Sequence, residues 1–182
     1  EKFLDALLLD PEWSRTLLLG DVLGIDPARH LLPLAIEFHK NWDLLKPGTP
    51  AELPETQFSR LIALGRSLDL QESTYIGSAD SDGMTTCLDA IREFVDELEA
   101  GFDEIEQVTT LADAALPSGK RAGQKKNWTD IQSLRSDYET YREEVASSKA
   151  SLIDLILRRI TICITAFILD GVREQRNMGH LD

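Results

Sequence analysis

The chain has 182 residues, of which 42% are hydrophobic and 28% are charged, and its net charge is −13 with an isoelectric point near 4.6. This composition is typical of a folded protein and is too apolar for a disordered chain. Such an excess of negative charge repels phosphate backbones and anionic membrane surfaces, so nucleic-acid binding and generic membrane binding are disfavoured. A basic partner surface would be attracted instead.

The first part of the chain predicts a series of helices separated by breaks. Apolar residues spaced three and four apart predict helices over about residues 3–8, 11–20, 27–45 and 55–70. Asp26-Pro27 is a start signal, because aspartate caps helix N-termini and proline is tolerated at the first helical position. Pro33 could kink the third helix or move its start. Gly65 either weakens the fourth helix slightly or lets a neighbouring helix come close.

A long helix is predicted over residues 83–115. Its apolar residues step along the chain at intervals of four and three: Met84, Leu88, Ile91, Val95, Leu98, Phe102 and Ile105. This spacing places the side chains on one stripe, which must be buried against other helices. The residues between are mostly acidic, so the opposite face is strongly negative. We expect this face to bind a protein partner with a basic surface through Asp89, Glu93, Asp96, Glu97, Asp103 and Glu104.

Residues 78–89, at the start of this helix, resemble the calcium-binding loop of EF-hand proteins in the spacing of their oxygen-bearing side chains. The resemblance is limited. Ser78 stands where aspartate is usual, Thr85 where an aliphatic residue is needed, and Asp89 where glutamate is usual. We therefore interpret the segment as a polar loop in which Asp82 caps the following helix, and we predict no metal and no cofactor.

The segment 117–126 is the only basic patch on the chain and predicts a flexible linker. The region 127–176 follows it, and no glycine or proline occurs there before Asp170. Its three-four rhythm is interrupted only near Ser147, which predicts either one helix of about 45 residues or two helices meeting at that point. A continuous helix would need cover for its apolar seam. A monomer is favoured over a homodimer, because the 83–115 helix can supply much of that cover.

Together these elements predict an all-α fold: a single domain over residues 1–182, built as an antiparallel bundle of about five to seven helices with two long C-terminal arms, 83–115 and 127–176. The end of the second arm is apolar on several faces. We expect four of its side chains to be buried: Leu152, Ile156, Ile160 and Phe167. Its apolar run over 160–169 is about half as long as a membrane span, so no transmembrane segment is predicted.

Two cysteines, Cys87 and Cys163, lie in apolar stripes and predict buried reduced thiols, which favours a cytoplasmic location. The sequence contains no motif for a nucleophile, a phosphate loop, a dinucleotide or a metal. We therefore predict a non-enzymatic protein–protein interaction domain, an adaptor or oligomerisation module of a larger protein. Two alternatives stay open: a membrane-active or lipid-handling bundle that exposes its apolar C-terminal helix, and an enzyme whose carboxylates converge only in the fold.

Overall fold

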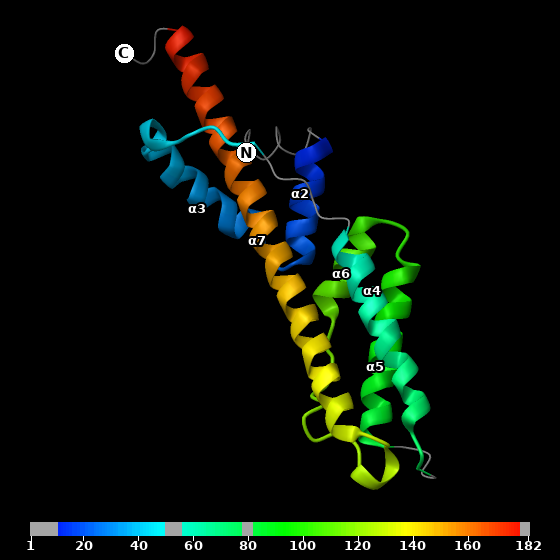
Figure 1. The fold of residues 1–182 in the computed structure, drawn as a ribbon. Coiled ribbons are helices and arrows are strands. Elements are labelled where there is room, and N and C mark those ends of the chain that lie inside the picture. Colours follow the sequence, from blue (N-terminus) through cyan, green and yellow to red (C-terminus); the bar gives the residue numbers. More distant parts are fainter. Residues whose placement is uncertain (1–10, 50–55, 78–81, 179–182) are drawn as a thin grey trace. The chain divides into compact units, whose positions relative to one another are not determined.

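The computed structural model describes residues 11–49, 56–77 and 82–178, which form six α-helices and three short 3-10 helices (Figure 1). The only β-type pairing within these residues is an isolated antiparallel bridge between Tyr75 and Trp128. The predicted all-α fold class is therefore confirmed. The helix predicted over residues 3–8 lies outside the described residues.

The chain packs as two compact units. Unit 1 consists of Glu1–Leu53 and Leu152–Asp182, and unit 2 consists of Pro54–Ser151. The single domain expected from the sequence stays a prediction.

Unit 2 is a helical bundle made of α4 (Thr56–Asp69), α5 (Gly83–Ala100), α6 (Glu104–Asp113) and the beginning of α7 (Ile131–Asn177). A 3-10 turn, η2 (Leu70–Thr74), follows α4, and a second one, η3 (Lys125–Asn127), precedes α7. Successive helices run in alternating directions, as the colours of Figure 1 show. Helices that follow one another in unit 2 are therefore antiparallel.

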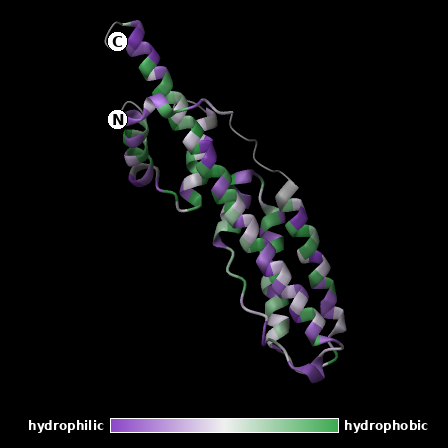
Figure 2. Ribbon diagram, turned by 60° about the vertical axis from the view of Figure 1, so that its left-hand side comes forward, coloured by the Kyte–Doolittle hydropathy of each residue, from purple (hydrophilic) through white to green (hydrophobic). Residues whose placement is uncertain are grey.

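The apolar stripe of α5 forms the centre of unit 2. Five of its predicted members are buried: Met84, Leu88, Ile91, Val95 and Leu98. Figure 2 shows hydrophobic and hydrophilic residues alternating along the helices of this unit, as expected of helices that bury one face. The seam at the beginning of α7 is buried as well: Ile131, Leu134, Tyr138, Tyr141 and Val145. The seam is thus covered within one chain.

The prediction of one continuous helix over 83–115 is wrong. The helix α5 ends at Ala100 and α6 begins at Glu104. Glycine at position 101 is a poor helix former, and Asp103 caps α6 by accepting a hydrogen bond from the Glu106 backbone N–H at 2.9 Å. The chain therefore turns between the two helices. Phe102, predicted to lie in the buried stripe, falls in this turn and is 98% exposed.

Unit 1 contains α2 (Pro11–Val22), α3 (Pro27–Lys40), η1 (Trp42–Leu44) and the remainder of α7. Asp26 caps α3 as predicted, accepting a hydrogen bond from the Arg29 backbone N–H at 3.1 Å. Gly20 on α2 faces α7, where a Cβ at this position would make an ordinary contact with Ile160 Cδ1 at 3.5 Å. The Arg176 guanidinium lies over the Trp42 ring, 4.7 Å from its centre.

The C-terminal region forms one helix and not two, because α7 continues through Ser147 without a break. Serine alone does not end a helix that contains no proline. Leu152, Ile156 and Ile160 are buried as predicted, but Phe167 is 38% exposed. The buried face continues instead in steps of four residues through Ile164, Ile168 and Val172. Each such step advances about 40° around the helix beyond a full turn, so the stripe drifts away from Phe167.

None of the described helices combines the length and the apolar character that crossing a membrane requires.

Candidate functional site

The acidic residues of α5 do not all face solvent as free charges. Arg66 on α4 reaches across to α5, where its Nη2 lies 2.6 Å from Asp96 Oδ1 and 2.6 Å from Glu99 Oε2. Asp96, one of the six predicted partner-binding residues, therefore has an intramolecular partner. The sequence pattern of α5 alone could not show this, because Arg66 belongs to another helix.

A second arginine makes a similar cluster one turn away on α5. Arg92 Nη1 lies 2.7 Å from Asp89, and its Nη2 lies 2.7 Å from Asp69 and 2.5 Å from Glu72. Hydrogen bonding to Asp69 is the largest reason why the pKa of Arg92 is raised, so this guanidinium stays charged. Asp89 is therefore also paired. Each of these part-exposed ion pairs is worth about 0–1 kcal/mol, so together they position α4 against α5 more than they stabilise it.

The remaining predicted residues differ in their surroundings. Asp103 caps α6, and Glu104 is half-buried in the first turn of that helix. Glu93 and Glu97 are exposed and have no ion-pair partner within the described residues. They lie four positions apart and hence on the same face of α5. Glu93 and Glu97 are thus exposed and neither ion-paired nor helix-capping within the described residues. They lie beside clusters in which two arginines meet five carboxylates and leave a net negative surface.

Asp82 is the centre of a buried polar cluster at the start of α5. Its carboxylate accepts hydrogen bonds from the backbone N–H of Met84 at 2.9 Å and of Gln124 at 3.0 Å, and from the Asn127 and Trp128 side chains at 3.0 Å each. Burial alone would raise the pKa of Asp82, but these four donors together outweigh burial and lower it. The side chain is therefore a saturated carboxylate that fixes residues 124–128 to α5, and the predicted N-cap is confirmed.

Residues 78–81 of the calcium-like segment lie outside the described residues. Across the parts of the chain that are described, no three histidine, cysteine, aspartate or glutamate side chains come together in a way that could hold a metal ion.

The basic segment 117–126 is attached to α7 by its backbone. The Tyr138 hydroxyl donates a hydrogen bond to the Pro117 carbonyl at 2.9 Å. Arg135 donates to the carbonyls of Ala122 at 2.7 Å and Gly123 at 2.8 Å. The four bases of the segment are exposed: Lys120, Arg121, Lys125 and Lys126.

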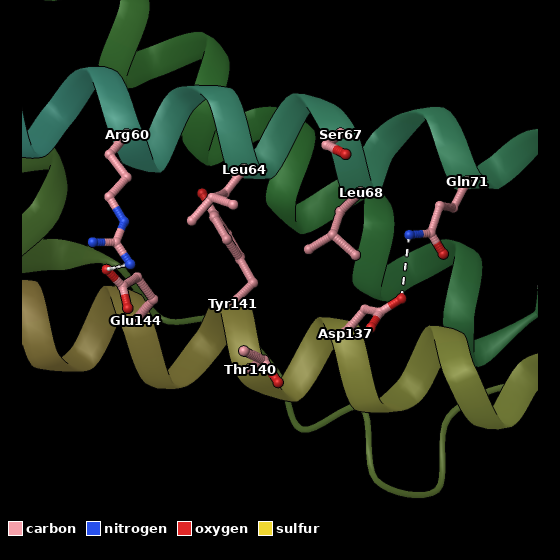
Figure 3. A pocket seen from close by; sticks show the side chains of 9 residues that line it. All are labelled: Arg60, Leu64, Ser67, Leu68, Gln71, Asp137, Thr140, Tyr141 and Glu144. Atoms are coloured by element: carbon pink, nitrogen blue, oxygen red, sulfur yellow. Dashed lines mark hydrogen bonds and ion pairs between the residues drawn. The ribbon is translucent and has the colours of Figure 1, made fainter.

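An open cleft of about 410 Å³ lies in unit 2 between α4 and the beginning of α7 (Figure 3). Its apolar lining comes from Leu64 and Leu68 on α4 and from the ring of Tyr141 on α7. The volume is within the range of small-ligand sites, which also combine apolar walls with a few polar groups. The cleft is therefore a second candidate site, and nothing in the sequence pattern indicated it.

Charged side chains stand at both ends of this cleft (Figure 3). At one end Arg60 Nη2 lies 3.0 Å from Glu144 Oε1. At the other end Gln71 Nε2 donates to Asp137 Oδ2 over 3.4 Å, a weak contact with an uncharged partner.

Tyr141 carries the unusual feature of the cleft. Its side chain is 2% exposed, and its hydroxyl is buried without a hydrogen-bond partner within the described residues. A Cβ on Gly65 of α4 would lie only 2.8 Å from this hydroxyl, so α4 covers it closely. Burial raises the pKa of Tyr141, which keeps the hydroxyl protonated and able to donate. An unpaired buried hydroxyl costs about 1–3 kcal/mol, so it requires an explanation.

Comparison of the chain with protein-family models, with curated proteins and with solved structures finds no match. Function therefore has to be inferred from the geometry and charge of the sites themselves.

Proposed function

We propose that the protein is a non-enzymatic interaction module that binds a protein partner through the exposed acidic surface of α5. The observation that carries this proposal is the pair Glu93 and Glu97, exposed on one face and without an ion-pair partner within the described residues. A basic partner surface would gain two charge contacts there without breaking the arginine clusters.

The buried face of α5 supports the proposal. Because its apolar stripe is fixed in the core of unit 2, the exposed face is held in one orientation. A rigid surface loses little conformational entropy on binding. The chain's net charge of −13 would also speed the encounter with a basic partner at low ionic strength.

The test reverses the two charges. The double variant Glu93→Lys and Glu97→Lys should remain folded, because both side chains are exposed, and should lose the partners that the wild-type protein captures from its native host. A matched control reverses two exposed carboxylates elsewhere in unit 2, Asp113→Lys and Glu143→Lys, which changes the net charge equally. Quantitative mass spectrometry of the captured proteins, with circular dichroism as the folding check, provides the measurement.

If the control variant loses the same partners as the α5 variant, net charge and not the α5 surface accounts for capture. If neither variant loses partners, the acidic surface serves only solubility. Asp96 is left unchanged in this test, because its reversal would also break the Arg66 cluster.

We also propose that the binding form is a monomer, because the seam from Ile131 to Val145 is buried within one chain. Light scattering should give a concentration-independent mass near 20.4 kDa. A constant mass of twice this value would contradict the proposal.

A further inference from the structure

The α4–α7 cleft combines open volume, an apolar lining and a buried hydroxyl without a partner. Figure 3 shows Tyr141 extending from α7 toward α4, so that its hydroxyl lies beside Leu64. The hydroxyl is a donor, and an occupant that supplies a carbonyl oxygen would give it the hydrogen bond that the described residues do not. The cleft thus contains a hydrogen-bond donor, the Tyr141 hydroxyl, that has no acceptor within the described residues.

The two ends of the cleft differ in charge. Glu144 is already neutralised by Arg60 at 3.0 Å. Asp137 has only the long contact with the uncharged Gln71, and no cation within the described residues pairs with it. The Asp137 end therefore keeps an uncompensated negative charge, which favours a cationic group on the occupant.

The spacing of these two features limits the size of the occupant. Asp137 and Tyr141 lie four residues apart on one face of α7, which separates their backbone positions by about 6 Å along the helix axis, and the Tyr141 side chain extends from there toward α4. A lysine stem of four carbons spans a gap of this order while it packs on apolar side chains. One basic residue can therefore reach Asp137 with its charged end while its own carbonyl lies near Tyr141.

We propose that the α4–α7 cleft binds a lysine or arginine residue of a partner's peptide segment. Its aliphatic stem packs on Leu64 and Leu68, its charged end pairs with Asp137, and its backbone carbonyl accepts the hydrogen bond of Tyr141. This contact requires Leu64, which lies beside the buried hydroxyl and is 40% exposed, to turn aside. The site rests on the proposed protein-binding function, but it uses none of the acidic residues of α5.

The probe is a blocked pentapeptide, acetyl-Ala-Ala-Lys-Ala-Ala-amide, added to isotope-labelled protein and followed by NMR. We expect saturable shifts of backbone amides that are confined to residues 64–71 and 137–144. The matched peptide with norleucine in place of lysine keeps the stem and lacks the charge, so it should bind about tenfold more weakly. Equal binding of the two peptides would overturn the proposal, as would the absence of saturable shifts with either.

Variants of the cleft test the same contacts from the protein side. Tyr141→Phe and Asp137→Asn should each weaken the lysine peptide about fivefold or more, because each removes one polar contact. Tyr138→Phe should leave the affinity unchanged, since that hydroxyl bonds to Pro117 and lies outside the cleft lining. Ser67→Trp fills the cleft from an exposed position and should abolish binding. It changes no buried residue, so it tests the proposal independently of the stability of the other variants. Unchanged affinity in both Tyr141→Phe and Ser67→Trp would overturn the proposal.

The two proposed surfaces can fail separately. Reversal of Glu93 and Glu97 should leave peptide binding in the cleft intact. If it also removes the cleft shifts, the peptide is held by general charge attraction, and the cleft proposal is contradicted. If partner capture survives that reversal while cleft variants lose peptide binding, the α5 proposal fails and the cleft proposal stands.

Discussion

The Asp82 cluster and the α4–α7 cleft are both polar sites in unit 2, yet they differ in how completely their hydrogen bonds are satisfied. Asp82 is 5% exposed and receives four hydrogen bonds, whereas the equally buried Tyr141 hydroxyl receives and donates none within the described residues. A saturated buried group holds a fold together. An unsaturated one beside an open cleft indicates a site that a ligand completes.

The same contrast appears between two tyrosines one turn apart on α7. Tyr138 and Tyr141 are both buried, and burial raises the pKa of both hydroxyls. Tyr138 donates to the Pro117 carbonyl, while Tyr141 faces Gly65 and the cleft. The neighbours that each hydroxyl meets thus decide whether it contributes to stability.

The largest effect on stability is expected at the Asp82 cluster, whose hydrogen bonds are all satisfied. Asp82→Ala removes the common acceptor of two backbone and two side-chain donors, and several of these are left buried and unpaired. We expect the free energy of unfolding to fall by about 3–5 kcal/mol. Urea unfolding followed by the fluorescence of Trp128, in a background where Trp13 and Trp42 are phenylalanine, measures this in unit 2.

Asp130→Ala is the matched control for this prediction. Asp130 also accepts two backbone hydrogen bonds, from Gln132 and Ser133, but it is exposed. Its loss should lower stability by only about 1 kcal/mol. If both variants lose the same free energy of unfolding, burial of the Asp82 cluster contributes nothing to stability.

The Asp82 cluster should also make stability depend on acid pH. Because the pKa of Asp82 is lowered in the folded protein, its ionised form contributes stability that is fully present above the ordinary aspartate value of about 3.9. That contribution is lost as the pH falls through the lowered folded pKa. The stability difference between wild type and Asp82→Asn should therefore be largest at neutral pH and should narrow below about pH 3.9 in urea unfolding. A stability difference between the two proteins that stays constant with pH would contradict the lowered pKa of Asp82.

An intermediate effect is expected where α4 passes over the cleft tyrosine. A Cβ at Gly65 would clash with Tyr141 and Val95, so Gly65→Ala should lower stability by about 1–3 kcal/mol, although alanine is the better helix former. Gly171 in α7 is the control, because a Cβ there meets nothing within 4 Å. Gly171→Ala should raise stability by about 0.5–1 kcal/mol. Calorimetric unfolding of both variants checks the opposite signs.

The sequence predicted those features that depend on periodicity and local capping. The buried stripe from Met84 to Leu98 and the caps at Asp26 and Asp82 are confirmed. Of the two alternatives that the sequence leaves open for Gly65, the structure shows the close approach of a neighbouring helix. The predicted stripe is wrong at Phe102, because the combined effect of Gly101 and the Asp103 cap is stronger than the apolar rhythm.

The candidate sites were less accessible to sequence reasoning, because they depend on which helices lie side by side. The pairing of Asp96 with Arg66 joins residues 30 positions apart, and that of Asp89 with Arg92 belongs to a cluster that includes α4. Nothing in the local pattern separates Tyr138 from Tyr141. Only the packing of α4 over α7 does so, and packing between helices has no local sequence signal.

The most direct test of this account compares the two tyrosines. Tyr138→Phe removes a hydroxyl that makes a hydrogen bond and should lower the free energy of unfolding by about 1 kcal/mol. Tyr141→Phe removes a buried hydroxyl that makes none, so it should leave the stability unchanged or raise it by up to about 1 kcal/mol. Urea unfolding of the two variants beside the wild type gives the difference. If Tyr141→Phe loses as much stability as Tyr138→Phe, the Tyr141 hydroxyl already has a partner, and the cleft is not an incomplete site.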